Sequence, residues 1–109
     1  MIQSEKVAKV MLDADRNNYA PRNQYANRPQ YIGYNVTISA PHMHAFALEH
    51  LSNFSTKGAH ILDVGSGSGF LTVVSSKTTN DAGIVVGIEH IPQLYDFGIS
   101  NVKKIMEIY

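Results

Sequence analysis

The stretch Ala59–Glu89 reads AHILDVGSGSGFLTVVSSKTTNDAGIVVGIE, and it decides the fold of this chain. It opens on an apolar run, Ala59–Val64, that is typical of a buried parallel strand. The run breaks into the glycine-rich loop GSGSG, and a helix candidate, Phe70–Lys77, follows. After a turn signal at Asp81–Gly83 comes a second apolar strand, which ends on the carboxylate of Glu89. Strand, glycine loop, helix, strand and terminal acid together predict a βαβ nucleotide-binding unit.

The spacing of the glycines narrows the class of ligand. A dinucleotide fingerprint reads G-x-G-x-x-G, but here the third glycine arrives one residue early and is followed by Phe70. No phosphate-binding Lys follows the loop, which excludes a P-loop. An acid, Asp63, two residues before G-x-G-x-G resembles the pattern of class I S-adenosylmethionine (AdoMet) methyltransferases. The glycines let the backbone approach an adenosyl and methionyl group, and both oxygens of Glu89 can accept ribose hydroxyls.

Composition limits the other function classes. The chain has 109 residues and a formal net charge of zero, so there is no electrostatic case for nucleic acid or an anionic membrane as partner. It has no cysteine, which excludes disulfides and thiolate chemistry and fits a cytoplasmic location. No apolar run approaches the length that a membrane span needs. The length predicts a single domain, 1–109.

The segments around the βαβ unit carry weaker signals. An apolar stripe predicts a helix over 1–12, and the polar run Asp13–Asn18 should end it. Ala20–Gln30 is expected to be an irregular loop, and Tyr31–Ile38 is β-prone but split by Gly33. A helix is predicted to start with Ser39 as N-cap and to expose one apolar face to the core, formed by Met43, Phe46, Ala47, Leu48 and Leu51. A last helix opens at Pro92, with one side formed by Leu94, Tyr95, Gly98, Val102, Ile105 and Tyr109.

One run in this region is far more specific than any glycine loop. This run is TISAPHMHA over 37–45, and with Asp15-Arg16, Tyr19 and Ile32-Gly33 before it, it resembles the protein-L-isoaspartate O-methyltransferase family. The same family shows the run DVGSGSG and a Gly-Ile-acid-His-Ile stretch, which is Gly87–Ile91 in this chain. The resemblance spans nearly the whole sequence, from about Val10 to Lys104.

The resemblance implies an α/β, Rossmann-like class I AdoMet-dependent methyltransferase fold, truncated to its N-terminal helices and first βαβ unit. Residues 1–58 would be helices and a loop that contact substrate and cofactor, and 59–109 the AdoMet-binding βαβ unit. The activity would be protein repair: methyl transfer from AdoMet, leaving S-adenosyl-L-homocysteine, to the free α-carboxylate of L-isoaspartyl residues in damaged proteins. By position, Ser39 is the catalytic residue, and the cofactor-binding residues are Val36, Thr37, Ile38, Ser39, His44, Asp63, Gly65, Ser68, Glu89 and His90.

This chemistry needs few groups. A carboxyl group has a reference pKa of about 4, so it is already an ionised nucleophile at neutral pH and needs no general base. The sulfonium carbon is an activated electrophile, so no metal is expected. His42 and His44 could look like a metal pair, but at i and i+2 they point to different sides of a helix. Ser39 can hold the substrate carboxylate through one hydrogen bond, and the competing interpretation is that it only caps a helix.

Length is the main departure from the family, whose catalytic domain is about twice as long. A second hypothesis is therefore a catalytically inactive fragment that acts only as a cofactor-binding or dimerising module. If the chain ends at Tyr109, the strand Ile61–Val64 keeps an unpaired edge, which predicts self-association through the exposed sheet edge. A third hypothesis is an α/β module that binds NAD.

Overall fold

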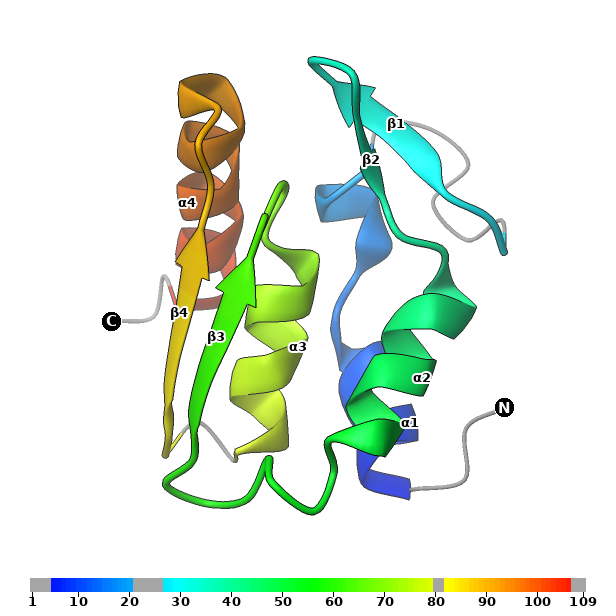
Figure 1. Ribbon diagram of the computed structural model, residues 1–109, viewed down its shortest axis with the longest axis vertical. Coiled ribbons are helices and arrows are strands. Elements are labelled where there is room, and N and C mark those ends of the chain that lie inside the picture. Colours follow the sequence, from blue (N-terminus) through cyan, green and yellow to red (C-terminus); the bar gives the residue numbers. More distant parts are fainter. Residues whose placement is uncertain (1–4, 21–26, 80–81, 107–109) are drawn as a thin grey trace.

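The computed structural model describes residues 5–20, 27–79 and 82–106 (Figure 1). From β2 onward, helices and strands alternate along the described chain, as is typical of an α/β fold. In order, the elements are α1 (Glu5–Asp13), the short 3-10 helix η1 (Arg16–Asn18), β1 (Gln30–Gly33), β2 (Val36–Ile38), α2 (Pro41–His50), β3 (His60–Val64), α3 (Phe70–Thr78), β4 (Ile84–Ile88) and α4 (Pro92–Met106).

The predicted βαβ unit is confirmed. Strands β3 and β4 pair in parallel, in a register that runs from His60 opposite Ile84 to Val64 opposite Ile88. Helix α3 connects them, and Figure 1 shows the two strands standing in front of α3 and α4. The glycine loop is fastened to the end of β4, because the backbone N–H groups of Gly65 and Ser66 both donate to the Ile88 carbonyl, at 2.8 and 2.9 Å. The loop therefore begins at the carboxyl ends of both strands.

The β-prone segment around Gly33 forms a hairpin. Strands β1 and β2 pair antiparallel, with Gly33 opposite Val36, so that Tyr34 and Asn35 form a two-residue turn. Both turn residues have positive φ, 57° and 58°, as the hairpin turn that matches strand twist requires. The predicted break at Gly33 is thus the start of a turn, and the chain leaves β2 directly toward α2.

The hydrophobic core lies between the N-terminal helices and the helix side of the βαβ unit. Helix α1 contacts both α2 and α3. The buried side chains that form this core are Val7, Val10, Ala14, Tyr19, Ala20, Ile32, Ile38, Leu48, Phe70, Val73, Val74 and Leu94. Full burial of a Val, Leu or Phe side chain is worth about 1.5–3 kcal/mol, so this cluster is the main force that holds the N-terminal segment against the βαβ unit.

Two expectations about α2 are wrong. Its N-cap is Ala40, so Ser39 is not the cap, and a first-turn N–H, that of His42, donates instead to Oδ1 of Asn27 at 3.1 Å. The buried side of α2 is formed by His44, Ala45 and Leu48, whereas Met43, Phe46 and Leu51 are exposed. Helix α2 contacts α1, and its buried positions fall at i, i+1 and i+4 from His44, which lie on one side of a helix. Because His44 is polar, apolar periodicity in the sequence does not indicate that this side of α2 is buried.

The face of the β3–β4 pair that points away from α3 is uncovered. Alternate residues of both strands are exposed, and the register places them on one face. That face carries the aliphatic side chains of Leu62, Val64, Ile84, Val86 and Ile88. Among the described strands, β3 pairs only with β4, so the expected unpaired edge of β3 is present.

The remaining expectations are met in part. The start of the predicted first helix (1–4), most of the loop Ala20–Gln30 (21–26), Asp81 of the turn and Tyr109 lie outside the described residues. The polar run Asp13–Asn18 ends α1 as predicted, but η1 begins three residues later at Arg16. On α4, Leu94 is buried and Tyr95 is exposed. No helix in the described ranges is long and apolar enough to cross a membrane.

Candidate functional site

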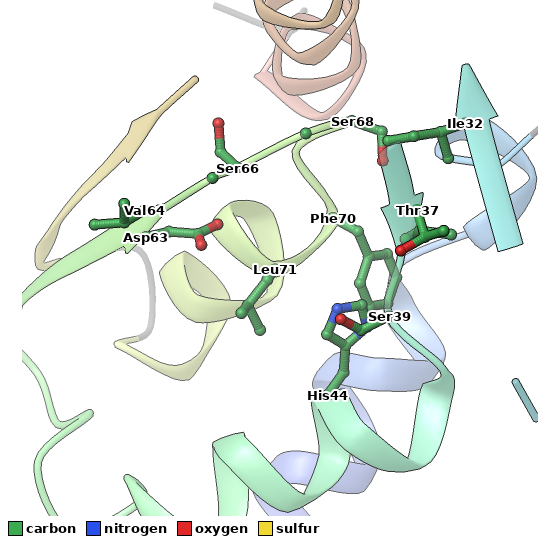
Figure 2. Close-up of a pocket in the computed structure, with 13 residues that line it drawn as sticks. Ile32, Thr37, Ser39, His44, Asp63, Val64, Ser66, Ser68, Phe70 and Leu71 are labelled. Carbon is green, nitrogen blue, oxygen red and sulfur yellow. The ribbon is translucent and has the colours of Figure 1, made fainter. Parts of the chain in front are cut away.

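A pocket of about 170 Å³ opens at the carboxyl end of β3. The glycine loop and the start of α3 form one wall, and the hairpin with the segment entering α2 forms the other; Figure 2 shows Ser39 and His44 next to Phe70. In parallel α/β sheets the ends of the strands are where ligands bind. The lining residues are Ile32, Thr37, Ile38, Ser39, His44, Asp63, Val64, Gly65, Ser66, Gly67, Ser68, Phe70 and Leu71.

Helix α4 fixes the glycine loop from behind. The buried Asn101 side chain donates through Nδ2 to the carbonyl of Ser68 at 2.8 Å. One turn earlier, Gly98 lies so close to the loop that a Cβ there would be 3.2 Å from the Gly67 carbonyl oxygen. A Cβ at Gly69, whose φ is +92°, would in turn meet the backbone of Gly98 at 3.4 Å. Gly98 therefore allows the close approach of the helix to the loop, and Gly69 allows the positive φ at the end of the loop.

Glu89 connects the glycine loop to the start of α4. Its Oε1 accepts the backbone N–H of Gly67 at 2.7 Å, and its Oε2 accepts the backbone N–H of Ile91 at 3.1 Å. The side chain is only 4 % exposed, whereas that of the neighbouring His90 is 90 % exposed. Each carboxylate oxygen has a second lone-pair site, so Glu89 keeps acceptor capacity beside the loop.

Asp63 is held in place on the floor of the pocket. The hydroxyl of Thr72, on α3, donates to Oδ2 of Asp63 at 2.7 Å. Gly87 of β4 makes room for this contact, because a Cβ at that position would be 2.8 Å from the Thr72 hydroxyl oxygen. One oxygen of the acid in the predicted motif is thus fixed by a hydrogen bond from α3.

A cluster of aromatic and cationic side chains supports the opposite wall. The ring of His44 stacks on Phe70, with centroids 4.9 Å apart, and Arg16 lies 4.7 Å above the centre of the same Phe70 ring. Tyr19 contacts Phe70 edge-on at 5.3 Å. Burial, together with the Arg16 charge, lowers the pKa of His44 to about 4, and burial together with Asp15 raises the pKa of Tyr19 to about 12. Both rings are therefore neutral at pH 7.

Most of the site residues predicted from sequence meet at this pocket. The lining includes Thr37, Ile38, Ser39, His44, Asp63, Gly65 and Ser68. Val36, Glu89 and His90 are outside it. Glu89 touches the loop through Gly67, but the His90 side chain points into solvent apart from a 3.5 Å approach to Glu89.

Sequence reasoning missed several residues of the site. Ile32, Ser66, Leu71 and Phe70 line the pocket, and Arg16 supports it from below. Phe70 had a signal, since it follows the last loop glycine directly, where a dinucleotide site has no bulky residue. Nothing in the local pattern around Arg16 indicates that its side chain is buried; only tertiary packing decides that.

The described residues hold no cluster of three or more His, Asp or Glu side chains that could bind a metal. His42 illustrates the point. Its ring nitrogen Nδ1 and its backbone N–H lie 2.7 and 3.1 Å from the side-chain oxygen of Asn27, while His44 is buried on the other side of α2.

Comparisons with known proteins identify the family. Residues 1–107 match the family described as protein-L-isoaspartate(D-aspartate) O-methyltransferase. A protein-L-isoaspartate O-methyltransferase of Caenorhabditis elegans is 50 % identical over 101 residues, which cover 93 % of this chain and 45 % of the relative. The protein of that name from Triticum aestivum is 46 % identical over 106 residues, which cover 95 % of this chain and 46 % of the relative.

A solved structure shows the same fold. A Plasmodium falciparum protein described as a protein-L-isoaspartate O-methyltransferase, in complex with S-adenosyl-L-homocysteine, superposes with a TM-score of 0.88 at 40 % identity. The match covers 94 % of this chain and 49 % of that one. The chain thus spans about half the length of the relatives that it matches.

Fold and site together define an α/β protein of the Rossmann-like methyltransferase class, with a glycine-loop pocket at the ends of its parallel strands. More narrowly, the chain belongs to the protein-L-isoaspartate O-methyltransferase family.

Proposed function

We propose that this chain binds AdoMet at the glycine-loop pocket and takes part in methyl transfer to the free α-carboxylate of L-isoaspartyl residues in proteins. The observation that carries the proposal is the convergence of two distant segments. Thr37, Ser39 and His44 meet the DVGSGSG loop at one pocket. Both segments lie within residues 1–107, over which the chain matches its family.

The residues present fit an adenosyl and amino-acid ligand. Gly65, Gly67 and Gly69 all have positive φ, at 79°, 55° and 92°, a conformation that favours glycine, and Gly65 and Gly67 are in the pocket lining, where they present no side chain to a ligand. Glu89 and Asp63 supply carboxylate acceptors for hydroxyl or ammonium donors. The third glycine of the loop comes one residue earlier than in G-x-G-x-x-G and is followed by Phe70, which favours this ligand over NAD. When bound, AdoMet supplies a methyl group on a sulfonium.

The chain's own residues need only bind, orient and exclude water. Ser39 is exposed at the pocket wall and is not engaged as a helix cap, so its hydroxyl can donate to the substrate carboxylate. The aromatic wall of Phe70 removes water from one side. Orientation and desolvation of this kind account for large parts of a transfer barrier without acid–base chemistry.

The test of this proposal is transfer of a labelled methyl group from AdoMet to a peptide with one isoaspartyl residue. The same peptide with a normal aspartyl residue is the matched control. Label that appears on the isoaspartyl peptide alone supports the proposal, while no label on either peptide removes the catalytic part of it.

A second candidate function has a specific observation in its favour. The aliphatic face of β3–β4 and the unpaired edge of β3 are exposed in a chain that spans about half of its relatives. An aliphatic face next to an open edge is a template for another strand. A second copy of this chain presents the same face and edge, so a twofold pairing of the two β3 edges would continue the sheet. In this alternative the chain is a cofactor-binding or dimerising module without activity.

The remaining parts of the proposal concern partners and location. Isoaspartyl-containing proteins and peptides are the proposed partners. Nucleic acid and anionic membranes are left out, because the formal net charge of the chain is zero. A cytoplasmic location is proposed because the chain has no cysteine and so forms no disulfides, which are characteristic of proteins in oxidising compartments.

A further inference from the structure

One buried cation contacts the lining of the pocket without being part of that lining. Arg16, in η1, is 2 % exposed. Its Nη2 donates to the carbonyl oxygen of Ser39 at 3.0 Å, and its Nη1 lies 3.2 Å from Nδ1 of His44. The guanidinium also lies over the ring of Phe70. A single side chain thus contacts three residues of the pocket lining, from two separate parts of the chain.

The contact with His44 decides where the imidazole carries its proton. A guanidinium has only N–H donors and no acceptor. Nδ1 of His44, at 3.2 Å, must therefore accept, and in the neutral ring the proton then resides on Nε2. Burial and the Arg16 charge lower the pKa of His44 to about 4, so the ring is neutral at pH 7. Its stacking on Phe70 fixes the plane of the ring.

The contact with Ser39 acts on the main chain. Ser39 is the last residue before the N-cap of α2, and its own side chain does not cap that helix. The Arg16 hydrogen bond to its carbonyl sets the peptide plane between Ser39 and Ala40. Ser39 is consequently held from the backbone side, and the hydroxyl is left to the pocket.

We infer that Arg16 is a positioning residue that holds His44 as its Nε2–H tautomer and holds Ser39 by its carbonyl, so that an imidazole N–H and a hydroxyl act together on a carboxylate ligand. The inference deepens the proposed function and rests on it only for the identity of that carboxylate. Two sources share this chemistry: the amino-acid carboxylate of the cofactor and the α-carboxylate of the isoaspartyl substrate.

The tautomer is directly measurable in the unmodified chain. Long-range ¹H–¹⁵N correlation spectra of ¹⁵N-histidine-labelled protein at pH 7 distinguish a protonated ring nitrogen from an accepting one. We expect Nδ1 of His44 to be the accepting nitrogen, with a preference for the Nε2–H form of about tenfold or more, since a hydrogen bond from a charged donor favours it. A protonated Nδ1, or a rapid mixture of both tautomers, would overturn the inference.

Variants then assign the effect to Arg16. Arg16→Met removes the donors and should leave His44 as a tautomer mixture. Arg16→Lys keeps the charge on a single nitrogen, which cannot contact both Ser39 and His44 as the two guanidinium nitrogens do, and it should shift or broaden the His44 signal. Lys9→Met is the matched control, because Lys9 is an exposed cation on the preceding helix. An Arg16→Met spectrum identical to wild type would contradict the inference. If Arg16→Met does not fold, the Arg16→Lys spectrum decides in its place: an unaltered His44 signal, in both position and line width, contradicts it.

Titration identifies the carboxylate. S-adenosyl-L-homocysteine is titrated into wild type and Arg16→Lys, and the isoaspartyl peptide is titrated in its presence. About tenfold weaker cofactor binding assigns the cofactor carboxylate; an equal loss confined to the peptide assigns the substrate carboxylate. Unchanged binding of both overturns the positioning role. If wild type binds neither ligand while the Nε2–H tautomer is found, the proposed function fails and the placement of His44 by Arg16 stands.

Discussion

The backbone N–H of Gly67 donates to Oε1 of Glu89 at 2.7 Å, across 22 residues of sequence. This bond joins the glycine loop after β3 to the acid after β4. Because Oε2 of the same carboxylate accepts the N–H of Ile91, the loop, the strand end and α4 are fixed relative to one another. Glu89 is therefore part of the architecture of the pocket as well as a proposed ligand of the cofactor.

Glu89→Gln should lower the free energy of unfolding by about 1–3 kcal/mol, since an amide nitrogen cannot accept one of the two backbone N–H groups. Urea denaturation measures this, and calorimetry with AdoMet should show a loss of affinity of similar size. His90→Ala is the control, because that side chain is exposed and should change stability little. Equal effects of the two substitutions would remove Glu89 from its role in the loop.

Asn101→Ala should destabilise the chain by about 1–3 kcal/mol, because it leaves the buried carbonyl of Ser68 without its side-chain donor. The expected companion effect is weaker binding of AdoMet, since Ser68 is in the pocket lining. Ser100→Ala, at an exposed neighbouring position, serves as control in the same denaturation series. A neutral Asn101→Ala would show that α4 does not hold the loop through this bond.

Acid should weaken the fold through His44. Its pKa is about 4 in the folded chain and about 6.5 when unfolded, so the unfolded chain binds the extra proton between these values. The contribution is fully present above about pH 6.5 and is lost as the pH falls through about 4, up to a total of about 3 kcal/mol. In His44→Gln, which stays neutral and can still accept from Arg16, this part of the pH dependence should disappear. A stability profile that is the same in both proteins would refute the assignment to His44.

The uncovered sheet makes a prediction about association. Leu62→Lys or Val86→Lys places a charge on the exposed aliphatic face, and should convert a self-associating chain into a monomer by light scattering. Leu12→Lys is the control, because Leu12 is equally apolar and 85 % exposed but lies on α1, away from the sheet. If wild type is monomeric at every concentration tested, the dimerising alternative is discarded.

The βαβ unit could be predicted from the sequence because the signals for its strands and its loop are local. An apolar run, three glycines, a turn and a second run fix strand, loop and strand without help from the rest of the chain. The αL turn at Tyr34 and Asn35 was not predicted, because neither residue is glycine. The convergence of residues 37–44 with the loop came only through family resemblance.

The errors share a physical cause. Ser39 has good intrinsic cap chemistry, but Arg16 holds its carbonyl and the helix begins one residue later. The side of α2 that faces the core contains His44, whose burial depends on Phe70 and Arg16 from other elements. Buried polar side chains are chosen by tertiary partners, and periodicity of apolar residues does not report them.

Ser39→Ala should leave stability within about 0.5 kcal/mol, since the hydroxyl caps no helix, and should lower methyl transfer more than AdoMet affinity. Wild-type turnover in this variant would leave the serine without a role in the reaction.

The central claim is that the pocket serves methyl transfer to isoaspartyl carboxylates, and the decisive measurement is incorporation of labelled methyl from AdoMet into the matched isoaspartyl and aspartyl peptides. The account predicts label on the isoaspartyl peptide and none on the aspartyl peptide. Absence of label from the isoaspartyl peptide, or equal label on both, would contradict it.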